Sequence, residues 1–234
     1  MNQKKIFRMC AIVMGISGLL ILFSTLFPIF YYEWEAEQKY PVLISSLVDE
    51  DRGSFKFSQT DYTKASNWFS GAKNEDYSIQ KVGYFTISIP RLGIDSASVA
   101  VGSEDLSDSL VQYPGTALPG KIGNTVIFGH SILPQYFDPT NYLSIFSTLP
   151  KLQKRDEITV SFDGIVYKYK VEDMFEVKPT DIQILEQSTN TSYLTLVTCT
   201  PPGHPLKPRR LIVRAKLTPA GQANASTGHS IGLE

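Results

Sequence analysis

The sequence of 234 residues is poor in the side chains that could form a disulfide framework or a histidine-rich metal site, with only two cysteines and three histidines. It also lacks an excess of charge of either sign, because 22 basic and 23 acidic side chains give a net charge of −1. Nucleic-acid binding depends on clustered Lys and Arg that neutralise phosphates, and no such cluster occurs beyond the N-terminus. We therefore expect no nucleic-acid partner.

A single long hydrophobic run is present, at the N-terminus. Lys4, Lys5 and Arg8 precede the uncharged run Met9–Tyr32, which is longer than the about 20 residues that a helix needs to cross a bilayer. Basic residues before the run and acidic residues after it favour a single-pass protein of the cell membrane, with its N-terminus in the cytoplasm. A cleaved signal peptide is the alternative. We favour a retained anchor, because the run is long for a signal peptide and no A-x-A-like cleavage site follows it.

Composition divides the chain into four segments. Residues 1–32 form the short cytoplasmic N-terminus and the anchor, and residues 33–81 read as a polar, extracytoplasmic stem. A strand-rich domain follows over 82–217, and the small, polar residues 218–234 are expected to be a disordered tail.

The stem is unusual for a polar connecting segment because it carries several large aromatic side chains. These are Phe55, Phe57, Trp68 and Phe69. They indicate that the stem rests on an apolar surface.

The domain over 82–217 has the pattern of an all-β fold. In YFTISIP, Phe85, Ile87 and Ile89 alternate with polar residues, which is typical of a half-buried strand. Further short apolar runs are separated by Gly and Pro, and helical signals are confined to residues 141–152 and 180–187, the second with Thr180 or Asp181 as its N-cap. Many short strands with few helical turns predict a closed β-barrel or a sandwich.

The placement of the two cysteines points to chemistry at one of them. If the anchor is retained, Cys10 lies at its cytoplasmic end and Cys199 lies outside, so the two cannot form a disulfide. An unpaired thiol is unusual in an exported domain, where cysteines are mostly paired. The alternative is a buried and inert Cys199 that acts as a small hydrophobic residue.

Thiol chemistry at an amide or ester also needs a proton shuttle. His229 falls in the polar tail and His204 in a proline-rich loop. His130 ends the apolar run GNTVIFGHS, so it leaves a strand as Cys199 does. A histidine at a strand exit can be an ordinary surface residue, but together with Cys199 it becomes the preferred candidate.

The third requirement is a group that stabilises an oxyanion. If Tyr193–Thr198 and Arg210–Leu217 pair as antiparallel strands, Cys199 at the end of one faces Arg210 at the start of the other. A guanidinium stays protonated at any relevant pH and could bind the substrate carbonyl. Arg209 is the weaker candidate, because its side chain would point to the opposite face.

Three motifs in this order resemble the sortases, membrane-anchored cysteine transpeptidases of Gram-positive-type bacteria. TLVTC, ending at Cys199, is similar to the TLxTC signature of that family. The family's segment with the catalytic histidine is similar to YPGTALPGKIGNTVIFGHS. Its final strand, which carries the catalytic arginine, is similar to RRLIVRAKL. The similarity runs from about Gly83 to Leu217.

The resemblance implies a closed, eight-stranded sortase-type β-barrel with a few short helices, preceded by a transmembrane helix. It implies that Cys199 is the nucleophile, His130 the general acid/base and Arg210 the group that holds the scissile carbonyl and its oxyanion. Thr198 would help to form the substrate-contacting wall. The expected substrates are proteins with an LPxTG-like C-terminal sorting signal, and the acceptor is an amine on a peptidoglycan precursor or a pilin. No cofactor is expected.

The subclass and the reaction outcome leave alternatives open. Pilin-polymerising class C sortases usually carry an aspartate-proline-aromatic motif before the barrel, and the stem has none, which favours a housekeeping-like or class D-like role. Glu104, Asp105 and Asp108 lie where some class A sortases bind calcium, but their spacing does not match, so we expect no metal.

The competing functions are a cysteine peptidase that hydrolyses the thioacyl enzyme, and a non-enzymatic anchored barrel. An L,D-transpeptidase is disfavoured because that family's His…Ser-x-Gly-Cys arrangement is missing.

Overall fold

The computed structural model of the chain describes residues 3–40, 61–70, 83–188 and 190–219. The expected disorder of the tail therefore falls almost entirely outside the described residues, as do His229, Phe55 and Phe57.

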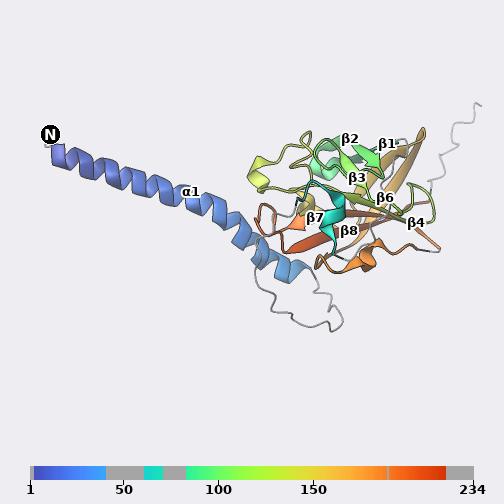
Figure 1. Cartoon of the computed structure of the whole chain (residues 1–234). Coiled ribbons are helices and arrows are strands. Elements are labelled where there is room, and N and C mark those ends of the chain that lie inside the picture. The colour runs from blue at the N-terminus through green and yellow to red at the C-terminus, as the bar shows by residue number, and fades with distance from the viewer. Residues whose placement is uncertain (1–2, 41–60, 71–82, 189, 220–234) are drawn as a thin grey trace, which may run out of the picture.

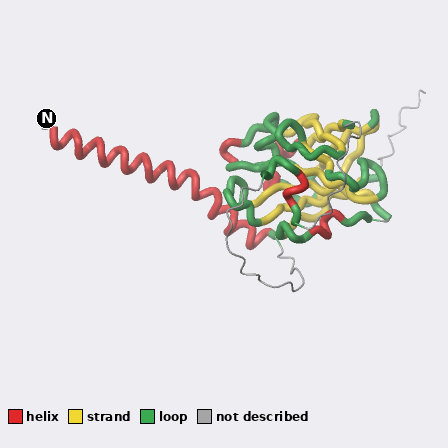
Figure 2. The backbone as a smooth tube through the Cα atoms, in the orientation of Figure 1, coloured by secondary structure: helices red, strands yellow, loops and turns green. Residues whose placement is uncertain are grey.

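The N-terminal hydrophobic run forms one long helix. Helix α1 spans Gln3–Lys39 and so continues past Tyr32, the expected end of the span. Within the part of the chain that the structure describes, it is the one helix that is long and apolar enough to cross a membrane. Figures 1 and 2 show α1 projecting from one side of a compact strand-rich body. Its apolar side chains are exposed along most of its length, as a lipid-facing helix requires.

The strand-rich body is a closed barrel, which confirms the barrel rather than the sandwich. Its strands are β1 (Tyr84–Ile89), β2 (Ile94–Val101), β3 (Leu110–Gln112), β4 (Gly123–Phe128), β5 (Glu157–Phe162), β6 (Ile165–Val177), β7 (Ser192–Thr200) and β8 (Arg209–Leu217). They close in the order β1-β2-β3-β4-β7-β8-β6-β5. The pairs β2–β3 and β4–β7 are parallel, and the other pairs are antiparallel.

Alternation along the strands separates two buried clusters. Leu196 of β7 and Val213 of β8 belong to the larger cluster, which fills the barrel. The neighbouring Val197, Cys199 and Ile212 belong to a second cluster on the outer face of the same strands. Because successive strand residues point to opposite faces, the sequence pattern of β7 and β8 decides that Cys199 lies on the outside wall of the barrel.

The β5–β6 hairpin shows how local sequence sets the register. Asp163 and Gly164 connect the two strands with φ of 51° and 72°. A two-residue hairpin turn of type I′ needs positive φ at both positions, which Asp-Gly supplies at low cost. The turn pairs Phe162 directly with Ile165.

The helical segments in the barrel are shorter than the sequence pattern indicates. The described residues contain five 3₁₀ turns: η1 (Ala65–Trp68) in the stem, and η2 (Pro90–Leu92), η3 (Pro134–Tyr136), η4 (Leu149–Lys151) and η5 (Ile182–Leu185) in the barrel domain. Asp181 precedes η5 as expected, but its carboxylate accepts a hydrogen bond from the backbone N–H of Lys178 at 2.8 Å and does not cap the turn. Short apolar runs of this length do not offset the cost of nucleating an α-helix.

Candidate active site

The pairing of β7 with β8 places the candidate nucleophile beside the candidate oxyanion group. The strands are antiparallel and Cys199 is directly opposite Arg210. This confirms the expected register. Both side chains are almost completely buried, at 1% exposure each.

A parallel strand pair brings the candidate histidine to the same edge. Strand β4 runs beside β7, with Phe128 opposite Val197, and the N–H of Gly129 continues the ladder to the carbonyl of Val197 at 3.1 Å. His130 therefore follows β4 at the edge where β7 ends, one residue after Cys199. A Cβ at Gly129 would lie 2.5 Å from side-chain carbons of Leu110 and Phe146, so the chain before His130 passes where no side chain fits.

Two side-chain hydrogen bonds tie these strand exits together. The hydroxyl of Thr198 is fully buried and donates to the carbonyl of Gly129 at 2.8 Å. The hydroxyl of Ser131 donates to the carbonyl of Cys199 at 2.7 Å. The bonds run in opposite directions and flank His130 on both sides, so they hold the backbones of His130 and Cys199 in a fixed relation.

Arg210 is held by carbonyl oxygens and aromatic rings. Its Nε donates to the carbonyl of Trp68 at 3.2 Å, and its Nη1 donates to the carbonyls of Lys207 and Arg209 at 2.8 and 3.1 Å. The guanidinium carbon lies 5.6 Å from the ring centres of Tyr62 and Trp68. Salt bridges between described residues do not involve Arg210. Among the described residues, its charge is thus oriented but not neutralised by a carboxylate.

The stem residues 61–70 cover this site. The ring of Trp68 is fully buried, stacks on Phe128 at 5.2 Å and 8°, and lies 5.6 Å from the ring of His130. Phe69 packs on the same Phe128 ring at 5.9 Å. The expectation that Trp68 and Phe69 rest on an apolar surface is confirmed, and that surface is the wall beside Cys199.

Backbone hydrogen bonds fasten this covering segment at both ends. The N–H of Ala65 donates to the carbonyl of Glu104, and the N–H of Leu106 donates to the carbonyl of Thr63, each at 2.9 Å. At the other end the N–H of Ser70 donates to the carbonyl of Pro179 at 2.8 Å. The site is closed in this conformation.

Burial sets the protonation states of the candidate nucleophile and the candidate acid/base. Desolvation lowers the pKa of His130 to about 4, with a smaller lowering by Lys207 and an opposing effect of Asp105 and Asp61. Desolvation raises the pKa of the Cys199 thiol, although Arg210 and Lys207 act in the opposite direction. In the covered state both groups are therefore neutral near pH 7.

We expect Trp68→Ala to expose the thiol. Loss of a buried Trp costs about 3–5 kcal/mol, and 1.4 kcal/mol corresponds to a factor of ten. Iodoacetamide should then alkylate Cys199 at least about tenfold faster. Since burial raises the thiol pKa, the rise of this rate with pH should begin at lower pH in the variant.

The matched control is Asn67→Ala, because Asn67 is an exposed residue of the same segment. It should leave the rate and its pH dependence unchanged. Equal rates in Trp68→Ala and the unmodified protein would show that the segment does not close the site.

The remaining candidates lie apart from this cluster. Arg209 forms ion pairs with Glu176 at 2.9 Å and with Glu33 of α1 at 3.6 Å. His204 lies in the loop before β8, where its Nδ1 accepts a hydrogen bond from the N–H of Leu206 at 3.1 Å. The preference for Arg210 over Arg209 thus agrees with the geometry.

Sequence reasoning missed three residues of this region. Ser131 has no motif of its own, and only the β4–β7 pairing shows what it binds. The other two are Lys207 and Tyr62, whose ammonium group and ring centre lie 4.6 Å apart. This contact forms only because the stem packs on the barrel. The aromatic content of the stem was the one available signal.

Comparison with known proteins identifies the family. The family model of the sortase domain matches residues 87–218. Sortase A of Streptococcus agalactiae serotype III (strain NEM316) is 31% identical over 78 residues, a match that covers 33% of this chain and only 30% of that relative's length.

Solved structures agree with this match. Sortase C1 of Streptococcus agalactiae is 34% identical, with a TM-score of 0.51 over 63% of this chain and 74% of that one. A Clostridium perfringens sortase D5 transpeptidase is 30% identical, with a TM-score of 0.50 over 58% of this chain and 79% of that one.

Proposed function

This chain belongs to the sortase family of cysteine transpeptidases, and on that premise we propose that it cleaves an LPxTG-like C-terminal sorting signal and transfers the protein to an amine acceptor of the cell wall. One observation carries the assignment of residues. Cys199 is paired directly with Arg210 across β7 and β8, at the edge where β4 delivers His130.

In the first half of the reaction, His130 takes the proton of the Cys199 thiol, and the sulfur attacks the carbonyl carbon of the scissile amide. The carbonyl oxygen becomes an oxyanion, which the guanidinium of Arg210 stabilises with N–H donors released from the Trp68 carbonyl. His130 then gives a proton to the leaving amine nitrogen, and the C–N bond breaks. A thioester on Cys199 remains.

In the second half, His130 takes a proton from the incoming amine, which attacks the thioester carbonyl. A second oxyanion forms at the same carbonyl and collapses, a new amide is made, and the sulfur of Cys199 leaves and takes back a proton from His130. The covalent intermediate divides one difficult amide exchange into two easier steps. Thr198 supports the wall of this site from behind, since its hydroxyl bonds the carbonyl of Gly129.

The acceptor has two candidates, an amine on a peptidoglycan precursor and the lysine of a pilin. The missing aspartate-proline-aromatic motif argued against the pilin, but residues 61–70 cover the site without that motif. The cell-wall acceptor remains the proposal, with pilin polymerisation as the second candidate.

The experiment that tests the reaction uses the full chain in detergent, an LPxTG peptide and an added amine. Mass spectrometry of the products should show the peptide joined to the amine after the Thr. If the product is only the free acid at saturating amine, the protein is a hydrolysing cysteine peptidase.

We expect Arg210→Lys to lower kcat/KM severely, although it retains the charge. Lys cannot reproduce the planar array of donors, and loss of an oxyanion donor typically costs about 10²–10³-fold in rate. Steady-state kinetics on the sorting peptide measure this loss. Arg209→Ala is the matched control and should have a mild effect, since its partners are Glu176 and Glu33. An Arg209 variant slower than the Arg210 variant would reverse the assignment.

A further inference from the structure

Two loops of the barrel lie beside the transmembrane helix. The first, residues 131–137, follows His130 and contains η3; the second, residues 201–206, follows the end of β7. The carbonyl of Ser24 in α1 accepts a hydrogen bond from the side-chain amide of Gln135 at 3.4 Å. The second loop packs on the first closely enough that a Cβ at Gly203 would lie 2.6 Å from Leu133. In Figure 1 the two loops, yellow-green and orange-red, lie at the side from which α1 projects.

Helix length places this contact at the level of the lipid. A bilayer core of about 30 Å takes about 20 helical residues, so a span that begins at Met9 ends near Pro28 when upright. Ser24 is four residues earlier, about 6 Å on the lipid side of that boundary at 1.5 Å per residue. A tilted helix places more residues in the core and moves Ser24 deeper. The loop that bonds Ser24 therefore reaches the outer lipid–water interface.

The composition of the loops fits that environment. Neither 131–137 nor 201–206 contains Asp, Glu, Lys or Arg. Tyr136 is 64% exposed and Leu206 is 50% exposed. Tyr is enriched at membrane interfaces because its ring is apolar and its hydroxyl is polar. No protein surface among the described residues covers these side chains.

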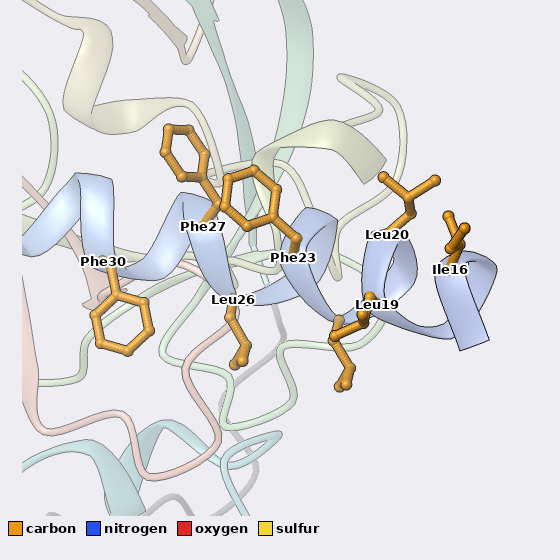
Figure 3. A pocket seen from close by; sticks show the side chains of 8 residues that line it. Ile16, Leu19, Leu20, Phe23, Leu26, Phe27 and Phe30 are labelled. Atoms are coloured by element: carbon orange, nitrogen blue, oxygen red, sulfur yellow. The ribbon is translucent and has the colours of Figure 1, made fainter. Parts of the chain in front are cut away.

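The adjoining surface of α1 is also apolar. A hollow of about 600 Å³ is lined by Phe23, Phe27, Phe30 and the leucines and isoleucine around them. Figure 3 shows Phe23 and Phe27 on the same side of the helix, with ring centres 5.1 Å apart. In a membrane-spanning helix these exposed apolar side chains would face lipid, and Phe23 directly precedes Ser24 in the sequence.

Contacts farther along α1 fix the barrel in this orientation. The hydroxyl of Tyr32 donates to Glu176 at 2.7 Å, and Arg209 binds both Glu33 and Glu176. Tyr32, Ala36 and Tyr40 are buried against the barrel. The helix and barrel are thus joined over several turns and not by a single hydrogen bond.

We propose that loops 131–137 and 201–206 rest on the outer lipid–water interface, so that the edge carrying His130 and Cys199 opens at the bilayer surface. The inference rests on the membrane anchoring that the family and α1 support.

Quenching by brominated lipids tests the placement. The full chain is reconstituted into phosphatidylglycerol-containing vesicles with brominated acyl chains, in a Trp34→Phe background that removes the native interfacial indole. Tyr136→Trp places a new indole on η3. Tyr84→Trp is the matched control, because Tyr84 is 62% exposed at the start of β1. Trp68 is present in both proteins.

The indole at 136 should lose most of its added fluorescence to the bromines, and the indole at 84 should lose none. Flotation of the vesicles distinguishes a failure of the loop placement from a failure of the membrane anchoring. If the protein floats with the vesicles but position 136 is not quenched, the loop placement is wrong and the anchoring stands. If the protein does not float with the vesicles, the anchoring and the loop placement are both wrong.

Discussion

Cys199→Ala should abolish cleavage of a sorting peptide and every trace of a covalent acyl adduct, while the protein remains folded. The sulfur is the only atom in this account that bonds to the substrate, so no partial activity should survive. The hydroxyls of Thr198 and Ser131 do not replace it, because both are bonded to backbone carbonyls.

The thiol is buried with Val197 and Ile212 in the outer cluster, so the substitution also removes a small packing contribution. We expect a loss of about 1 kcal/mol in the free energy of unfolding, typical of a point substitution. Thermal unfolding checks that inactivity is not unfolding. Cys10→Ala is the matched control, since Cys10 is exposed in α1, and it should retain full activity.

His130→Ala should lower the rate at every pH, by about 10²–10⁴-fold as is typical for loss of general acid/base catalysis. The reason is that the leaving nitrogen then departs without a proton and the incoming amine keeps its own. Single-turnover kinetics with the peptide across pH 5 to 9 measure the effect. His204→Ala is the control, because that ring bonds its own loop, and it should be mild.

The pH dependence of stability gives an independent check on His130. Its pKa is about 4 in the folded protein and about 6.5 when unfolded. Between these values the unfolded chain binds the proton and the folded chain does not, so stability is lost as the pH falls from 6.5 to 4. His130→Ala should reduce that loss. An identical pH dependence in the variant would mean that the ring is not buried in solution as it is here.

The sequence predicted well those features that depend on neighbours along the chain. Alternation identified the faces of β1 and β8, and the pairing of Cys199 with Arg210 followed from treating the two apolar runs as neighbouring antiparallel strands. The apolar run predicted α1, because helix length and membrane thickness are directly related.

Features that depend on distant segments were not predictable in the same way. His130 reaches Cys199 only because β4 and β7 pair in parallel across more than sixty residues, and nothing local encodes that partner. The aromatic residues of the stem predicted contact with an apolar surface. They did not identify that surface, because it is determined by the stacking of Trp68 on Phe128. The helical patterns at 141–152 and 180–187 gave only turns, since tertiary contacts and Pro150 interrupt them.

Whether Cys199 carries the acyl group is tested most directly by peptide-mapping mass spectrometry of the full chain. The enzyme is mixed with a sorting peptide without an added amine, quenched in acid and digested. We expect a mass increase equal to the peptide up to its Thr, located on the fragment that contains Cys199 and removed by hydroxylamine. An adduct on any other residue, or turnover of the peptide with no adduct at any time, would contradict it.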